Sequence, residues 1–139
     1  MNDLLNIEVC EFYSVPRIAP RAIGKYVSKS ASFDINTCNH DGEPWDFTKA
    51  SNRQKAREYV SKNAPMFVIG SPPCDQWSIM QNLCSGKGNA EDVNRKMIEA
   101  RIHLEFCIEL YQMQIDAGRY HLHEHSTSAK SWKDPCMQR

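Results

Sequence analysis

The chain has 139 residues, which is enough for one domain with a single hydrophobic core. Its 17 basic and 17 acidic side chains balance, so overall charge provides no argument for a nucleic-acid or membrane-surface partner, and no apolar run approaches the roughly 20 residues of a membrane helix. Hydrophobic residues make up 41% of the chain and the N-terminus lacks a signal-peptide pattern, so we expect a globular cytoplasmic protein.

Strand and helix signals alternate along the chain. In chain order, we expect a strand over 7–12, a helix over 18–27, a strand over 31–35, a loop over 36–47, a helix over 51–62, a strand over 66–69, a helix over 91–117 and a strand over 120–124. Ser51 is expected to cap the second helix, and Gly118 to end the third. This alternation predicts a Rossmann-like α/β fold, a mostly parallel sheet with helices on both faces. We expect one domain over 1–139, a minimal or truncated version of that fold, because a complete doubly wound domain has more strands.

The longest expected helix has one apolar face, and its members recur every three or four residues. They are Met97, Ala100, Leu104, Cys107, Tyr111 and Ile115. Six cysteines lie at irregular spacings without a Cys-x-x-Cys pair, which argues against a zinc ribbon or a redox motif. Without a secretory signal we expect free thiols, with Cys107 and Cys10 as core residues.

The most informative stretch for function follows the strand expected over 66–69. It runs Gly70-Ser71-Pro72-Pro73-Cys74-Asp75-Gln76-Trp77-Ser78. Two prolines stop strand pairing and hold the backbone rigid just before the cysteine. A thiolate is a strong nucleophile, and Glu124, at the end of the next strand, can hold or donate a proton. Together they suit attack on an electron-poor ring carbon, with the acid protonating a ring nitrogen.

Polar side chains gather at the carboxyl ends of the expected strands, where open α/β sheets bind their ligands. These ends carry Ser14 to Arg17, Asp34, Gly70 to Ser78, and Glu124 to Ser126. The sequence therefore predicts an active site along one edge of the sheet.

The stretch from Gly70 to Cys74, with Trp77 and Ser78, resembles the Pro-Cys motif of cytosine-5 DNA methyltransferases. Their second catalytic motif, Glu-Asn-Val, corresponds here to Glu124 and His125. The resemblance spans about residues 8–126 and implies the fold and catalytic core of an S-adenosylmethionine-dependent methyltransferase. It implies that Cys74 attacks C6 of a cytosine flipped out of the duplex, while Glu124 stabilises protonation at N3 and C5 takes the methyl group. The implied substrate contacts are Arg17, Ser71, Pro73, Trp77, Ser78 and His125.

The same resemblance implies S-adenosylmethionine as the cofactor, bound at the first two strands. Asp34 ends the second strand, where an acid commonly binds a ribose hydroxyl. Asp46 corresponds to the acid that contacts the adenine amino group, and its aromatic neighbours can sandwich a purine. The residues assigned to the cofactor are Phe12, Ser14, Asp34, Asp46, Phe47 and Pro72.

Several positions depart from the family pattern. The loop over 12–17 has no glycine where the family has Phe-x-Gly-x-Gly. Asp75 stands in place of Gln, and its negative charge opposes formation of the thiolate at Cys74. His125 replaces the family's Asn. Neither a target-recognition region nor the Gln-x-Arg motif follows, so we expect a partner chain to supply target recognition.

The opening from Phe12 to Arg17, together with His123-Glu124-His125, is also similar to proteins linked to mobile elements. We expect DNA as the partner, with RNA left open, and a nucleoid or nuclear location if the chain acts on DNA. We expect no membrane partner.

Two other functions stay open. The first is a non-catalytic descendant that binds nucleic acid or protein, which the glycine-free loop favours. The second is a metal-dependent enzyme, because His121, His123 and His125 alternate along a strand and so share one face. Arg17, Arg21, Lys25 and Lys29 form a basic stripe that we interpret as a solvated helix face. Trp132 can pack over the site or close the core, and we favour the core.

Overall fold

The computed structural model describes residues 7–18, 21, 29–75, 77 and 89–138. Its elements are β1 (Glu8–Phe12), β2 (Lys29–Phe33), α2 (Ala50–Asn63), β3 (Phe67–Gly70), α4 (Ala90–Asp116), β4 (Tyr120–His123) and a 3-10 helix, η2 (Lys130–Lys133). None of the helices in this described part of the chain combines the length and the apolar character needed to cross a membrane.

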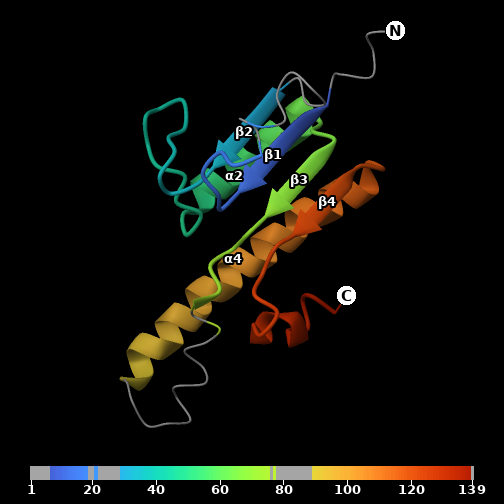
Figure 1. The fold of residues 1–139 in the computed structure, drawn as a ribbon. Coiled ribbons are helices and arrows are strands. Elements are labelled where there is room, and N and C mark those ends of the chain that lie inside the picture. Colours follow the sequence, from blue (N-terminus) through green and yellow to red (C-terminus); the bar gives the residue numbers. More distant parts are fainter. Residues whose placement is uncertain (1–6, 19–20, 22–28, 76, 78–88, 139) are drawn as a thin grey trace, which may run out of the picture.

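The four strands form one sheet in the order β2-β1-β3-β4, and every neighbouring pair is parallel. The last residue of each strand lies in register with the last residue of the next: Phe33, Phe12, Gly70 and His123. All four strands therefore end along one line (Figure 1). The parallel α/β sheet predicted from the alternating signals is confirmed.

The helices α2 and α4 pack on the same face of the sheet, and the hydrophobic core lies between them and that face. Cys10, Phe12 and Val68 point from the sheet into this core, where Phe12 stacks on Phe33 with ring centroids 4.5 Å apart. Cys10 and Cys107 are fully buried there, as predicted. The helix expected over 18–27 falls, except for 18 and 21, outside the described residues. The part of the expectation that placed helices on both faces is therefore not tested.

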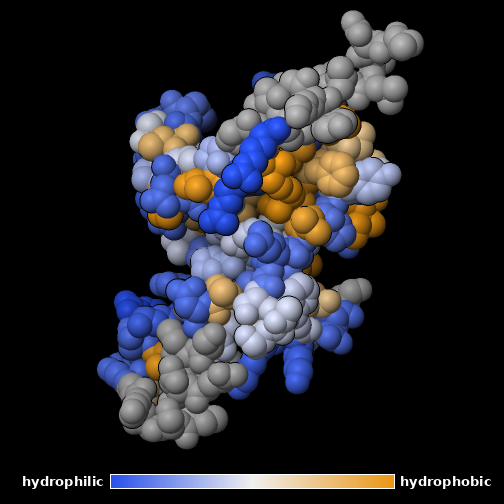
Figure 2. Space-filling view, in the orientation of Figure 1, coloured by the Kyte–Doolittle hydropathy of each residue, from blue (hydrophilic) through white to orange (hydrophobic). Residues whose placement is uncertain are grey.

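The opposite face of the sheet is apolar along β1, β3 and β4. Val9 and Ile69 are its buried hydrophobic members, and Phe67 stacks on Tyr120 across neighbouring strands. Hydrophobic side chains gather over these strands in the space-filling view (Figure 2).

Most element boundaries differ from the expected ones by one or two residues, and two of these differences have a clear cause. β2 ends at Phe33 rather than at 35, because Asp34 and Thr37 close a turn in which the Thr37 N–H donates to the Asp34 carbonyl over 2.9 Å. The expected cap at Ser51 is wrong. α2 begins at Ala50 after Lys49, whose carbonyl accepts from the Arg53 N–H, so Ser51 already lies inside the first turn.

α4 begins and ends within one residue of the predicted bounds. The Asn89 side chain accepts from the Glu91 N–H at its start, and Gly118 follows its end in the left-handed region, with φ +67°. One predicted core member is wrong, since Ile115 is 55% exposed. Gln114 is fully buried in its place and donates to the carbonyls of Pro65 and Tyr120 over 2.9 Å each. Those two carbonyls need a donor that an apolar side chain lacks.

Candidate functional site

The turn that carries Cys74 leaves the sheet from the end of β3. The Ser71 N–H donates to the Phe12 carbonyl over 3.1 Å, so pairing with β1 continues one residue beyond the strand. The prolines follow, and the Cys74 thiol is free and partly exposed. Burial raises the pKa of Cys107 to about 12, so that core thiol is held protonated. Of these two thiols, Cys74 is the one that the fold presents at the sheet edge.

Gly70 allows the core to approach this turn closely. A Cβ at Gly70 would lie 2.0 Å from the Tyr111 Oη and 3.0 Å from the Cys107 Sγ. The Tyr111 hydroxyl lies 3.3 Å from the Gly70 carbonyl and 2.7 Å from the His123 Nδ1. Tyr111 thus links the ends of β3 and β4 from the face of the sheet on which α4 packs.

Glu124 lies beside the turn and is bound to it twice. Its N–H donates to the Gly70 carbonyl over 2.8 Å, and its Oε2 accepts from the Ser71 Oγ over 3.2 Å. Its side chain is otherwise exposed. The two predicted catalytic residues therefore follow adjacent strands at the same edge, and a hydrogen bond links Glu124 to the turn that holds Cys74.

His125 also faces this turn. Its Nδ1 contacts the Ser131 Oγ. Burial lowers the pKa of His125, while the nearby carbonyls of Pro73 and Pro72 partly offset that shift. The histidine that replaces the family's Asn thus packs against the backbone of the Pro-Pro-Cys turn.

Trp132 covers the histidines at the end of β4 rather than closing the core, so the favoured interpretation of Trp132 is corrected. It is 36% exposed, and its ring lies edge-on to His123 with centroids 5.1 Å apart. Its Nε1 donates to the Ser126 carbonyl over 2.8 Å, which fixes the indole over the edge. Burial, followed by the charges of His125 and His121, lowers the pKa of His123 to about 4.

A cavity of about 280 Å³ opens at the ends of β1 and β2. It is lined by Tyr13, Asp34, Ile35, Trp45, Asp46, Phe47, Ser71, Pro73 and His103. Three residues predicted for the cofactor (Asp34, Asp46 and Phe47) thus meet two predicted for the substrate (Ser71 and Pro73). Two carboxylates and three aromatic rings give this cavity acceptors for hydroxyl and amino groups, together with flat apolar walls.

The two carboxylates of this cavity are held in place by their own loops. Asp34 accepts from the backbone N–H of Asn36 over 2.9 Å and from its side chain over 2.7 Å. The Thr48 hydroxyl donates to Asp46 over 2.6 Å and is the main cause that holds the pKa of Asp46 below its usual value. Asp46 is therefore an anion at neutral pH.

The glycine-free loop after β1 is built in a way that the sequence does not reveal. Tyr13 adopts φ +61°, a left-handed conformation that few non-glycine residues take. Its hydroxyl lies 2.9 Å from the His103 Nδ1 on α4. Glu11, only 2% exposed, accepts from the N–H groups of Arg17 and Ile18. The sequence offers one signal for Glu11, which is an acidic residue inside a strand expected to be buried. It offers no signal that would identify Tyr13 or His103.

The remaining predicted residues that the structure describes lie outside this cavity. Phe12 is fully buried and supports Phe47 from the core. Ser14 bonds to the neighbouring Val15 carbonyl over 2.8 Å, and Pro72 is buried. Arg17 is exposed, as is Arg21 of the basic stripe, whereas Lys25 and Ser78 fall outside the described residues. Trp77 is 3% exposed and lines a different cavity, against α4 and η2.

The three histidines of β4 share one face, as predicted. His121 stacks on Tyr111 at 4.6 Å, His123 also contacts Tyr111, and the rings of His123 and His125 lie 5.3 Å apart. Within the described ranges, however, no group of three His, Cys, Asp or Glu side chains is arranged to hold a metal ion. The metal-dependent alternative therefore finds no support in this part of the chain.

In comparisons with known proteins, no family model, curated protein or solved structure matches this chain. The relation to cytosine-5 methyltransferases thus stays a prediction from the motifs.

Proposed function

We propose that this chain is a cytosine-5 methyltransferase-like catalytic core, which uses S-adenosylmethionine and acts on DNA. The observation that carries the proposal is the meeting of three loops in one cavity, the first of which is the loop after β1, which contributes Tyr13. Asp34 and Asp46 come from the segment after β2, and Ser71 from the Pro-Pro-Cys turn, which also binds Glu124. Acids, aromatic rings and the nucleophile turn are the groups that this chemistry needs side by side.

The residues of the cavity fit the proposed cofactor. Asp34 suits the ribose hydroxyls, Asp46 suits the adenine amino group, and Phe47 and Tyr13 offer flat walls to the purine. When bound, S-adenosylmethionine supplies an electrophilic methyl group. The cavity volume of about 280 Å³ lies just below the roughly 300–1,000 Å³ of ligand sites.

The chain's own groups carry the proposed steps at the cytosine ring. The Cys74 thiolate forms a bond from Sγ to C6, and protonated Glu124 donates to N3, so that electron density moves to C5. After C5 has taken the methyl group, C5 gives its proton to solvent, the bond from Sγ to C6 breaks to return the thiolate, and N3 returns its proton to Glu124. Ser71 holds the Glu124 carboxyl toward the turn during these steps.

Cofactor binding is tested by calorimetry with S-adenosylmethionine. We expect the wild-type chain to bind S-adenosylmethionine. Asp46→Asn should bind it about tenfold more weakly, because the loss of one charged hydrogen-bond acceptor costs about 1.4 kcal/mol of binding free energy. Asp116→Asn, an exposed change at the end of α4, serves as the matched control and keeps full affinity.

The nucleophile is tested with DNA that contains 5-fluorocytosine, which lacks the C5 proton and so traps the covalent complex. We expect an adduct whose mass maps to Cys74, lost in Cys74→Ser and retained in Cys38→Ser, an exposed free thiol elsewhere. A chain that neither binds S-adenosylmethionine nor forms the adduct is the non-catalytic descendant, and the enzyme proposal is then abandoned.

A further inference from the structure

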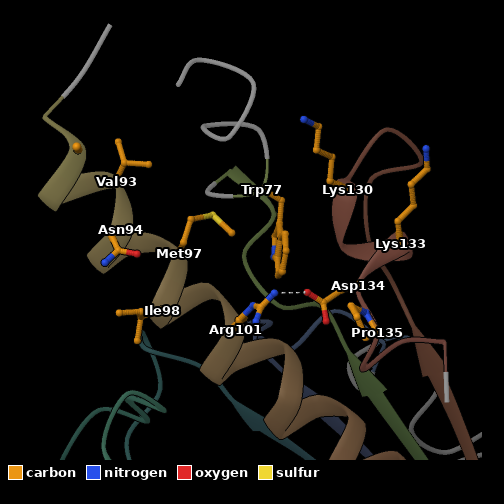
Figure 3. A pocket seen from close by; sticks show the side chains of 11 residues that line it. Trp77, Val93, Asn94, Met97, Ile98, Arg101, Lys130, Lys133, Asp134 and Pro135 are labelled. Carbon is orange, nitrogen blue, oxygen red and sulfur yellow. Dashed lines mark hydrogen bonds and ion pairs between the residues drawn. The ribbon is translucent and has the colours of Figure 1, made fainter. Parts of the chain in front are cut away.

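A second cavity, of about 670 Å³, lies between Trp77, the first half of α4 and η2 (Figure 3). We call it the α4 groove and define it by its floor, Trp77, Val93, Met97 and Ile98, and by its rim, Lys130 and Lys133. Its volume falls within the roughly 300–1,000 Å³ of ligand sites. None of the proposed steps at Cys74 uses it.

The floor of the α4 groove is apolar, with one polar exception. Trp77 is 3% exposed, and its Nε1 has no hydrogen-bond partner among the described residues. The Trp77 indole ring lies between α4 and η2 and faces the Met97 side chain (Figure 3). A buried donor without an acceptor costs free energy, so a ligand that brings an acceptor to this ring is favoured.

The rim of the α4 groove is positively charged. Asp134 is the acidic residue that lines the groove, and its charge is neutralised by Arg101, whose Nη2 lies 3.1 Å from the Asp134 carboxylate. Lys130 and Lys133 are exposed and pair with no acid in the described part of the chain. The groove therefore favours a ligand that joins a flat apolar portion to a negative charge.

The α4 groove adjoins the turn that presents Cys74. The Trp77 N–H donates to the Cys74 carbonyl over 3.1 Å, so one turn of backbone separates the thiol from the groove. We therefore expect a strand that brings a base to Cys74 to extend toward the groove that Lys130 and Lys133 line.

We propose that the α4 groove binds one nucleotide of a nucleic-acid strand, next to the nucleotide that reaches Cys74. The base lies on the apolar floor with an edge acceptor at the Trp77 Nε1, and a phosphate lies at Lys130 and Lys133. An acidic peptide also carries negative charge, but a flat base with acceptors in its plane better matches an indole N–H in an apolar floor. This inference rests on the proposed function, since it takes the substrate to be a nucleic acid.

Binding of fluorescein-labelled oligothymidylate, measured by anisotropy over a salt series, tests the rim. This probe contains no cytosine, so its binding does not depend on chemistry at Cys74. We expect the slope of log affinity against log salt to fall by about 0.7 for each lysine removed in Lys130→Gln/Lys133→Gln. Lys49→Gln/Lys62→Gln, which removes two exposed lysines from the ends of α2, is the matched control and leaves the slope unchanged.

Trp77→Phe tests the floor, because it keeps an aromatic ring and removes the N–H. We expect weaker oligothymidylate binding at every salt concentration with an unchanged slope, and an unchanged circular-dichroism spectrum. The lysine variant keeps the test decisive if Trp77→Phe fails to fold.

Three results overturn the inference: no binding of the oligothymidylate, equal slopes in the two lysine variants, or displacement of the probe by poly-glutamate of equal charge. The last result would identify a peptide site. The proposed function fails separately, through the absence of S-adenosylmethionine binding and of the Cys74 adduct, while oligothymidylate binding in the groove persists.

Discussion

Gly70 marks the closest approach between the sheet edge and α4. Gly70→Ala would place a Cβ 2.0 Å from the Tyr111 Oη, so either Tyr111 or the strand end must move. We expect a loss of about 1–3 kcal/mol in the free energy of unfolding, measured by urea denaturation.

Tyr111→Phe in the Gly70→Ala background should recover part of this loss, because it removes the atom nearest to the new methyl group. Gly42→Ala is the control, since its surroundings are open within 4 Å and only its φ of +79° opposes the change. Equal losses at Gly70 and Gly42 would contradict the packing explanation.

His123 makes the stability of the fold depend on pH. An unfolded histidine binds a proton below about pH 6.5, whereas folded His123 has its pKa lowered to about 4. Between these values the unfolded chain binds more protons, so the free energy of unfolding falls as the pH drops from about 6.5 to about 4. Burial lowers the pKa of His125 and His103 as well, which acts in the same direction.

We therefore expect urea denaturation at pH 7 and pH 5 to show lower stability at pH 5. His123→Asn should be less stable at pH 7, because Tyr111 loses its partner, but should lose less on going to pH 5. His40→Asn, an exposed change, should keep the wild-type difference. If His123→Asn loses as much stability between pH 7 and pH 5 as the wild-type chain does, the pH dependence belongs to other groups.

Cys74 and Glu124 could be selected as candidate catalytic residues from the sequence, because their residue types and their positions after two expected strands indicate the chemistry. Tyr13 and His103 could not be selected, because they matter through a contact between segments far apart in the chain. Tyr13 and His103, for example, are 90 positions apart and meet at 2.9 Å.

Among the elements, α4 depends on one buried amide at its C-terminal end. Gln114 donates to the carbonyls of Pro65 and Tyr120, and its Oε1 accepts from the Arg119 Nε over 3.0 Å. Gln114→Met keeps the volume but leaves two carbonyls without a donor, so we expect a loss of about 1–3 kcal/mol in the free energy of unfolding.

Gln112→Met, two residues earlier on the exposed side of α4, is the matched control and should change stability by less than about 0.5 kcal/mol. Urea denaturation of both variants measures the difference. If the two variants are equally stable, the amide bonds of Gln114 contribute nothing beyond packing.

The helical period of α4 correctly predicted Ala100, Leu104, Cys107 and Tyr111 as buried, and failed at Ile115. Periodicity identifies a face, but the amount of that face that stays covered depends on where the chain turns back. The chain turns at Gly118, and β4 then returns past Gln114 rather than Ile115.

At the scale of the whole molecule, α4 extends well beyond the sheet, and its two halves belong to different clusters (Figure 1). The half near Cys107 and Leu110 packs in the main core, whereas the first turns contact Trp77 and the C-terminal segment. Ile98 in that first half is 55% exposed.

We expect native-state hydrogen exchange to show its slowest amides around 104–111 and faster exchange around 93–98, because the outer half opens without the sheet. Leu110→Ala should speed exchange in both regions, whereas Met97→Ala should speed it in the outer half alone. Uniform protection along α4 would mean that the helix opens as one unit with the core.

The sequence by itself determined the parallel α/β pattern, the order of the elements and the rigid turn before Cys74, because periodicity, prolines and glycines act locally. Tertiary structure decided which of those residues meet. Because the strands end in register, Asp34, Asp46 and Ser71 lie around one cavity. Trp77 lines a separate groove, and Trp132 lies over the histidines of β4. These outcomes depend on the close packing of segments distant in the chain, which no local pattern encodes.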